Sequence, residues 1–247
     1  MKRLSVWSVA LLGVWVGLGV SCGEDDKADG DASVGGQGNG GTAGTGASAG
    51  SGTGGAAGAS PTGIPTPNGY LTQGTLKGTV ATNADTYGST ITLRTDTFCA
   101  SGTVVQVPLV DGGYDWGAWG AAFGWGLNQE LLADGGGGPA SGADLSAFSK
   151  VVVGLSGTTG AGLRLTLLTL DSDGGLLGPQ YCKSLPVTGT GDAGFALSDL
   201  TESCWNPGGA AFDPATVQPA GVAVNVLSST SGVESFDLCI TRLEFLP

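Results

Sequence analysis

An aromatic stretch, YDWGAWGAAFGWGLNQ, runs from Tyr114 to Gln129 and holds side chains of the kind that stack on sugar rings. In an extended strand, alternate residues point to opposite faces. From position 119 onward, one face would carry the large groups: Trp119, Ala121, Phe123, Trp125 and Leu127. The other face would carry only Gly120, Ala122, Gly124, Gly126 and Asn128. A strand with one wholly apolar face is typical of a core strand, so we expect Trp119, Phe123 and Trp125 to hold the fold.

Three other aromatic residues are candidates for ligand binding. Tyr114 and Trp116 precede the strand in opposite phase and lie in a turn-like, glycine-rich context, where functional residues concentrate. Trp205, beside Cys204, is the third. We expect these three to stack on sugar rings, and the bare glycine face nearby to admit a ligand or a neighbouring backbone. The alternative is that they cover the end of the folded domain.

Catalysis is not expected from this sequence. It contains no histidine, which excludes a Ser-His-Asp system and every histidine-bearing metal site. Residues 68–247 hold sixteen acidic residues, so a pair of carboxylates such as glycosidases use carries no information by itself. Most of these acids occupy turn-like positions, where they cap the backbone. We therefore assign no catalytic residues.

A metal site is not expected from the residues either. The run Asp171-Ser-Asp173-Gly174-Gly175 lacks the later ligands of an EF-hand loop, so we interpret it as a hairpin turn. The cysteines show no CxxC spacing and have no histidine to join them, which makes zinc the weaker interpretation.

The elements that must position these residues are strands. Apolar residues alternate with period two in several segments, such as Leu163, Leu165 and Leu167. In the last segment Phe236, Leu238 and Ile240 alternate, and the phase then slips to Leu243 and Phe245, which predicts a β-bulge. The expected strands are Leu76–Thr82, Ser89–Arg94, Thr103–Val107, Gly117–Leu127, Lys150–Leu155, Leu163–Leu170, Gln180–Val187, Gly194–Leu197, Gly221–Leu227 and Ser235–Phe245. About ten short strands between turn residues predict an all-β sandwich or jelly roll over residues 68–247.

The first 22 residues have the layout of a secretory signal. Lys2 and Arg3 precede an apolar run that ends at Ser21-Cys22. A cysteine closing such a run resembles the bacterial lipobox, in which the thiol is acylated, although Gly19 stands where leucine is usual. We expect a lipid anchor at Cys22; a plain signal peptide is the alternative. Residues 23–67 follow as an expected disordered tether, because 12 of the 26 residues from Val34 to Ala59 are glycine. Its mean reach is about 35–40 Å.

Four cysteines follow Cys22, and an even number in an exported chain predicts two disulfides. Three connectivities are possible. In a jelly roll the first and last strands are often neighbours, which favours Cys99–Cys239 and leaves Cys182–Cys204.

Several short motifs, in this order, resemble the galactose-binding-like jelly rolls of bacterial secreted proteins. They are Trp119-Gly120 with Gly124 and Leu127-Asn128, then Asp144–Val153, Ala196–Leu200 with Cys204-Trp205, Phe212–Ala215, and Phe236–Ile240. Members of that family are mostly carbohydrate-binding modules, and some hold a structural calcium, so the resemblance implies glycan binding and allows a calcium ion. The signal, tether and domain together resemble surface lipoproteins of myxobacteria and similar bacteria.

The leading functional hypothesis is a non-catalytic cell-surface lipoprotein, in the outer membrane or extracellular, whose domain binds glycan or acts in adhesion. Alternatives are a structural or protein-binding surface domain and, third, an unrecognised polysaccharide hydrolase. We expect a polysaccharide or cell-surface glycan as partner, a membrane reached only through the lipid, and a monomer. Residues 68–247 carry six basic and sixteen acidic residues, a formal charge of −10, which disfavours nucleic acid.

Overall fold

Strands dominate the computed structural model, which describes residues 62–111, 113–115, 117–176, 178–187, 189–205 and 208–247. The expectations for Cys22, for the signal and most of the tether, and for Trp116 lie outside these residues. The elements are η1 (Pro67–Gly69), β1 (Tyr70–Gln73), β2 (Leu76–Ala84), β3 (Thr90–Arg94), β4 (Cys99–Val104), β5 (Leu109–Val110), β6 (Gly113–Tyr114), β7 (Gly120–Gly126), β8 (Lys150–Thr159), β9 (Leu163–Thr169), β10 (Gln180–Ser184), β11 (Gly191–Ala196), η2 (Leu197–Asp199), β12 (Thr201–Glu202), β13 (Pro219–Leu227) and β14 (Glu234–Leu246).

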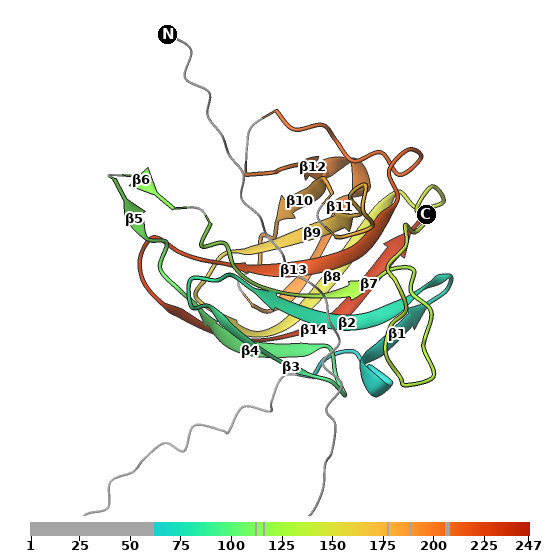
Figure 1. Ribbon diagram of the computed structural model, residues 1–247, viewed down its shortest axis with the longest axis horizontal. Helices are drawn as coiled ribbons and strands as arrows, with labels where there is room; N and C mark the ends of the chain where they lie inside the picture. The colour runs from blue at the N-terminus through green and yellow to red at the C-terminus, as the bar shows by residue number, and fades with distance from the viewer. Residues whose placement is uncertain (1–61, 112, 116, 177, 188, 206–207) are drawn as a thin grey trace, which may run out of the picture. The chain divides into compact units, whose positions relative to one another are not determined.

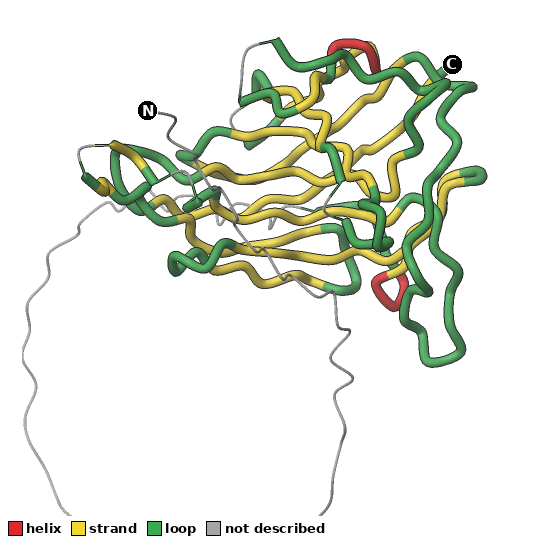
Figure 2. The backbone as a smooth tube through the Cα atoms, turned by 45° about the horizontal axis from the view of Figure 1, so that its top comes forward, coloured by secondary structure: helices red, strands yellow, loops and turns green. Residues whose placement is uncertain are grey.

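Two antiparallel sheets form the sandwich, and β5 and β6 pair in a separate two-stranded sheet (Figures 1 and 2). The seven-stranded sheet has the order β1-β2-β7-β13-β9-β10-β12, and the five-stranded sheet has the order β11-β8-β14-β4-β3. Strands far apart in sequence are neighbours, such as β2 and β7 or β4 and β14, as expected when connections cross between the sheets of a jelly roll. The domain is a jelly-roll β-sandwich, as the sequence predicted.

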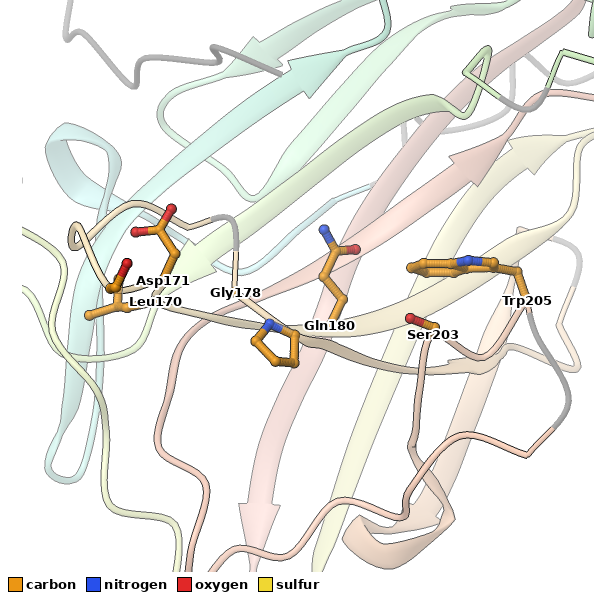
Figure 3. A pocket seen from close by; sticks show the side chains of 8 residues that line it. Leu170, Asp171, Gly178, Gln180, Ser203 and Trp205 are labelled. Atoms are coloured by element: carbon orange, nitrogen blue, oxygen red, sulfur yellow. The ribbon is translucent and has the colours of Figure 1, made fainter. Parts of the chain in front are cut away.

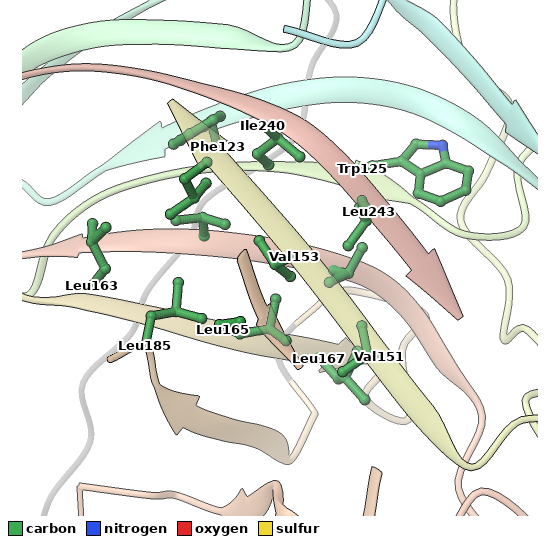
Figure 4. Close-up of a cluster of buried hydrophobic side chains, with 14 of the residues drawn as sticks. Phe123, Trp125, Val151, Val153, Leu163, Leu165, Leu167, Leu185, Ile240 and Leu243 are labelled. Carbon is green, nitrogen blue, oxygen red and sulfur yellow. The ribbon is translucent and has the colours of Figure 1, made fainter. Parts of the chain in front are cut away.

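The apolar faces of the two sheets meet in one core (Figure 4). Phe123 and Trp125 from β7, Leu165 from β9 and Val153 from β8 lie in it, and Ile240 from β14 joins them. The Phe123 ring meets Phe98 edge-on at a centroid distance of 5.9 Å. Burying such side chains is the main stabilising contribution to a sandwich of this size.

The expected aromatic core is confirmed for two residues and wrong for the third. Phe123 and Trp125 are buried, the latter with 2% of its surface exposed. Trp119 is only half-buried and precedes β7. The chain turns at Gly120, whose φ of 109° requires glycine, so Trp119 does not continue the inward face.

The bulge expected in the last strand is confirmed. Pairing of β14 with β8 shifts register between Ile240 and Arg242. Phe236, Leu238 and Ile240 are buried before the shift, and Leu243 and Phe245 after it. One extra residue thus keeps apolar side chains inward on both sides of the shift.

The two disulfides are those that the sequence predicted. Cys99 on β4 pairs with Cys239 on β14, at directly opposed positions of adjacent strands. Cys182 on β10 pairs with Cys204, which follows β12. The first closes a span of 140 residues and the second a span of 22 residues.

One expected strand is displaced, and four short strands were not expected. The segment predicted at Thr103–Val107 is instead β4, which ends at Val104. Beyond that point the Val105 amide donates to the Ser89 hydroxyl rather than to a strand neighbour. Strands β1, β5, β6 and β12 hold two to four residues each, too few for an alternation to be visible.

Contacts of the sandwich begin before Asn68, the expected boundary. The amide of Ile64 donates to the carbonyl of Ile240, and the amide of Phe98 donates to the carbonyl of Ile64.

Across the described ranges, no helix has the length and apolar character needed to cross a membrane.

Candidate functional site

The outward face of the seven-stranded sheet is built from very small residues at its centre. Ala122 and Gly124 of β7 stand beside Asn225 and Ala223 of β13 in the strand register. A Cβ added at Gly124 would lie 2.8 Å from the Cβ of Ala223, so the strands approach too closely there for a larger residue. We call this surface the small-residue face. Ala122 and Ala223 are themselves buried, with 8% and 5% of their surface exposed, whereas Asn225 is partly exposed. A ligand on this face would meet the sheet backbone closely, because no large side chain stands between them.

Polar side chains extend this face across the next strand. Arg164 and Thr166 of β9 pair in register with Asn225 and Ala223. The Thr166 hydroxyl donates to the side-chain oxygen of Asn225 at 2.7 Å. Arg164 and Thr166 are not among the site residues predicted from the sequence, although the inward alternation of Leu163, Leu165 and Leu167 turns them outward.

Trp205 stands at the edge of this face and is held from three directions. Its neighbour Cys204 is bonded to Cys182 of β10. The amide of Ser203 donates to the carbonyl of Gln180 at 2.8 Å, which ties the same segment to the start of β10. The guanidinium carbon of Arg164 lies 5.3 Å from the indole centroid, within cation–π range. The indole is nevertheless 51% exposed, so it is positioned yet available.

An open depression of about 560 Å³ lies beside Trp205 (Figure 3). Gln180 stands between Asp171 and Trp205 along it. Its lining residues are Leu170, Asp171, Ser172, Gly178, Pro179, Gln180, Ser203 and Trp205. An aromatic plane with amide, hydroxyl and carboxylate groups within one shallow hollow suits a polar ligand with flat apolar patches.

The turn at Asp171 forms one end of this hollow and confirms the interpretation of its sequence. The Asp171 carboxylate accepts hydrogen bonds from the amides of Asp173 at 3.0 Å and Gly175 at 2.8 Å. This is an Asx-type turn between β9 and β10. In the part of the chain that the structure describes, no cluster of three or more acidic, cysteine or histidine side chains could hold a metal ion.

Arg164 is electrostatically isolated. The described residues pair no carboxylate with it, whereas Arg94 pairs with Asp237 and Arg242 with Asp192 and Glu244. Its Nε is buried without a hydrogen-bond partner. Burial lowers the pKa of the guanidinium, although the group stays charged at neutral pH.

The structure separates the expected stacking residues. Tyr114 lies on β6, which pairs with β5 in a small hairpin of its own, and it is 43% exposed. Trp205 follows β12, the edge strand at the far side of the seven-stranded sheet from β1. Trp116 lies outside the described residues. The candidate site therefore contains Trp205 and not Tyr114.

The hairpin of Tyr114 is fixed to the turn after β2. The hydroxyl of Tyr87 donates to Asp115 at 2.6 Å, and the amide of Gly117 donates to the same carboxylate at 3.0 Å. These two hydrogen bonds, the one from Tyr87 being the larger effect, hold the pKa of Asp115 below its usual value. The same contact raises the pKa of Tyr87.

Fold and site together define a jelly-roll β-sandwich domain with a small-residue sheet face edged by one exposed tryptophan. The sequence matches no protein-family model and no curated protein. Among solved structures, the chain is similar to a family 11 carbohydrate-binding module from Clostridium thermocellum in complex with a β-1,3-1,4-mixed-linked tetrasaccharide, with 11% identity over 67% of this chain and 90% of that chain and a TM-score of 0.33. The family 11 module of the cellulosomal cellulase Lic26A-Cel5E of the same organism shows 12% identity over 67% and 89%, with a TM-score of 0.34. At these values the function has to be argued from the site itself.

Proposed function

We propose that this domain is a non-catalytic glycan-binding module and that its ligand lies across the small-residue face, against Trp205. The observation that carries the proposal is a half-exposed tryptophan at the edge of the small-residue face, next to a disulfide-bonded cysteine and within cation–π range of Arg164. A tryptophan that served only to pack against its own domain would be buried and would not be half-exposed in a fixed position. Exposed aromatic residues with a defined orientation are typical of binding surfaces.

The neighbouring groups match the chemistry of a sugar. An indole face contacts the C–H face of a pyranose ring, while hydroxyl groups need planar donors and acceptors close by. Arg164, Asn225 and Gln180 provide such groups, since the first two are paired in register and the third lines the depression. The glycine and alanine centre lets a flat chain lie close to the sheet.

The test is a glycan array probed with the full chain and with two matched aromatic variants. Trp205→Ala should lose binding, and Tyr114→Ala, an exposed aromatic on the separate hairpin, should retain it. Both side chains are exposed to a similar degree, so loss of fold does not explain a difference. If Trp205→Ala still binds the glycan, or if binding is lost only in Tyr114→Ala, the proposed site is wrong.

We further infer from the sequence that the chain is held at the bacterial surface by a lipid on Cys22. The acidic and glycine-rich residues 23–59 would separate the domain from the membrane. Two or three acyl chains make a durable anchor, since each buried methylene contributes about 0.8 kcal/mol.

A second candidate function is a protein contact at the β5–β6 hairpin. Leu109 is 68% exposed, and Val110 and Tyr114 beside it are exposed as well. Neighbouring exposed apolar residues favour association with another protein. Cross-linking on cell envelopes would test it: a product lost with Leu109→Ser but kept with Trp205→Ala supports this role, and identical products in both variants contradict it.

A further inference from the structure

Arg164 has no anionic partner in the described part of the chain, although the domain is strongly acidic. Residues 68–247 carry a formal charge of −10, from six basic and sixteen acidic residues. Arg94 and Arg242 both sit in ion pairs at 2.7–3.4 Å, and Lys77 pairs with Glu130, whereas Lys150 and Lys183, like Arg164, have no ion pair among the described residues. Among the described arginines, Arg164 is therefore the one whose charge no carboxylate neutralises, and this charge is available to an anionic ligand.

The surroundings of Arg164 direct that charge toward the proposed site. Its strand neighbours on the outward face are Asn225 of β13 and Ser184 of β10, both uncharged. Its guanidinium lies 5.3 Å from the Trp205 ring. The Nε atom is buried without a partner, while neither terminal nitrogen is among the buried unpaired atoms of the described residues. Arg164 as a residue is partly exposed, and we take its terminal nitrogens to be the atoms that meet a group arriving from solvent.

We propose, building on the glycan-binding role above, that the site takes a glycan carrying one acidic sugar, whose carboxylate binds the guanidinium of Arg164 while a ring of the glycan stacks on Trp205. A guanidinium presents its donors in the planar fork that a carboxylate fits. Partial burial of the guanidinium and of the carboxylate bound to it would make this interaction stronger than an ion pair exposed to solvent.

One acidic sugar fits this surface better than a polyanion. Asp171 lies at the other end of the depression from Trp205, so a second carboxylate there would meet a like charge. The negative domain as a whole also repels a polyanion at long range, whereas a single carboxylate contacts the local cation. The expected ligand therefore has an acidic residue, a uronate or a sialate, on an otherwise neutral glycan.

The alternative role for Arg164 is to support the indole only. The substitution Arg164→Gln separates the two roles when acidic and neutral ligands are compared. Loss of indole support weakens both ligands by the same factor. Loss of a carboxylate contact weakens only the acidic ligand, by about ten- to a hundredfold, the usual effect of a charge-assisted hydrogen bond. Arg242→Gln is the matched control, because Arg242 is paired with Asp192 and Glu244.

The experiment is calorimetric titration of the full chain with matched oligosaccharides. The pairs are 3′-sialyllactose with lactose and methylglucuronoxylotriose with xylotriose, and polygalacturonate serves as the polyanion. The acidic member of at least one pair should bind about ten- to a hundredfold more tightly than its neutral partner. Arg164→Gln should remove that difference, and Arg242→Gln should preserve it.

Failure of this inference is distinguishable from failure of the proposed function. Equal binding of acidic and neutral partners, still lost with Trp205→Ala, overturns the acidic preference and leaves the glycan site in place. A preference that survives Arg164→Gln, or tightest binding to polygalacturonate, also overturns it. If the array shows no glycan bound and none of these probes binds, both the inference and the proposed function fail.

Discussion

The guanidinium carbon of Arg164 lies 5.3 Å from the ring centroid of Trp205, and this contact joins the inner strand β9 to the segment beyond the edge strand β12. Strand β10 separates the two elements in the sheet. The contact therefore reaches over an intervening strand on the outward face. It brings the aromatic plane and the isolated cation of the proposed site together.

The Cys182–Cys204 disulfide should matter for ligand binding, because it fixes the residue next to Trp205. We predict that the double variant Cys182→Ala, Cys204→Ala loses about 2–5 kcal/mol of stability and also binds glycan more weakly. The double variant Cys99→Ala, Cys239→Ala should lose comparable stability and keep its affinity, since that bond joins strands of the other sheet. Chemical unfolding measures the two stabilities, and titration with the glycan at a temperature below both melting transitions measures the two affinities. Equal affinities in the two variants would contradict it.

Trp125 and Trp205 should respond oppositely to truncation. Trp125→Ala empties a core position with 2% exposure and should cost about 3–5 kcal/mol of unfolding free energy. Trp205→Ala removes a half-exposed ring and should change stability by less than about 1 kcal/mol. Urea denaturation followed by circular dichroism gives both values. A large loss of stability with Trp205→Ala would mean that the indole is a structural cover.

The Tyr87–Asp115 contact predicts a measurable pH effect. The folded pKa of Asp115 is lower than its unfolded value of about 3.9, so this carboxylate stabilises the native state above that pH. The contribution is lost as pH falls through the folded pKa. Tyr87→Phe removes the main cause and should raise the pKa of Asp115 toward its usual value. A carboxyl NMR titration measures the shift.

Asp144 provides the internal control for that titration. Its pKa is lowered by hydrogen bonds from Ser146 instead. It should titrate alike in the wild-type chain and in Tyr87→Phe. If the pKa of Asp115 is unchanged in Tyr87→Phe, the tyrosine hydroxyl is not the cause of the lowered pKa.

The lipid anchor at Cys22 remains a prediction from the sequence. Intact-mass measurement of membrane-extracted chain should show acylation and loss of residues 1–21. Cys22→Ser should release the domain or block its processing. A soluble chain that begins at another residue would rule out the anchor.

The sandwich could be predicted because its signals are local. The alternation of Leu163, Leu165 and Leu167, and the phase slip after Ile240, are properties of single strands, and both appear in the structure. Strand β12 could not be predicted, since two residues show no period. Its position depends on pairing with β10 and on the disulfide beside it.

The candidate site could be predicted only in part, because it is assembled across strands. Trp205 was a candidate from its type and its cysteine neighbour. Arg164 is 41 positions away in sequence, and only the order β13-β9-β10-β12 brings it under the indole. The sequence places Tyr114 directly before the aromatic strand and so predicts a shared binding surface, yet Tyr114 lies on the separate β5–β6 hairpin.

The position of the bound glycan decides whether the ligand lies on the small-residue face beside Trp205. The full chain, labelled with ¹⁵N, would be titrated with the glycan that it retains on the array, and its amide shifts followed. We predict the largest changes at residues 164–166, 180–184, 203–205 and 223–225, together with the indole N–H of Trp205. Changes confined to residues 109–115, or to the five-stranded sheet, would contradict it.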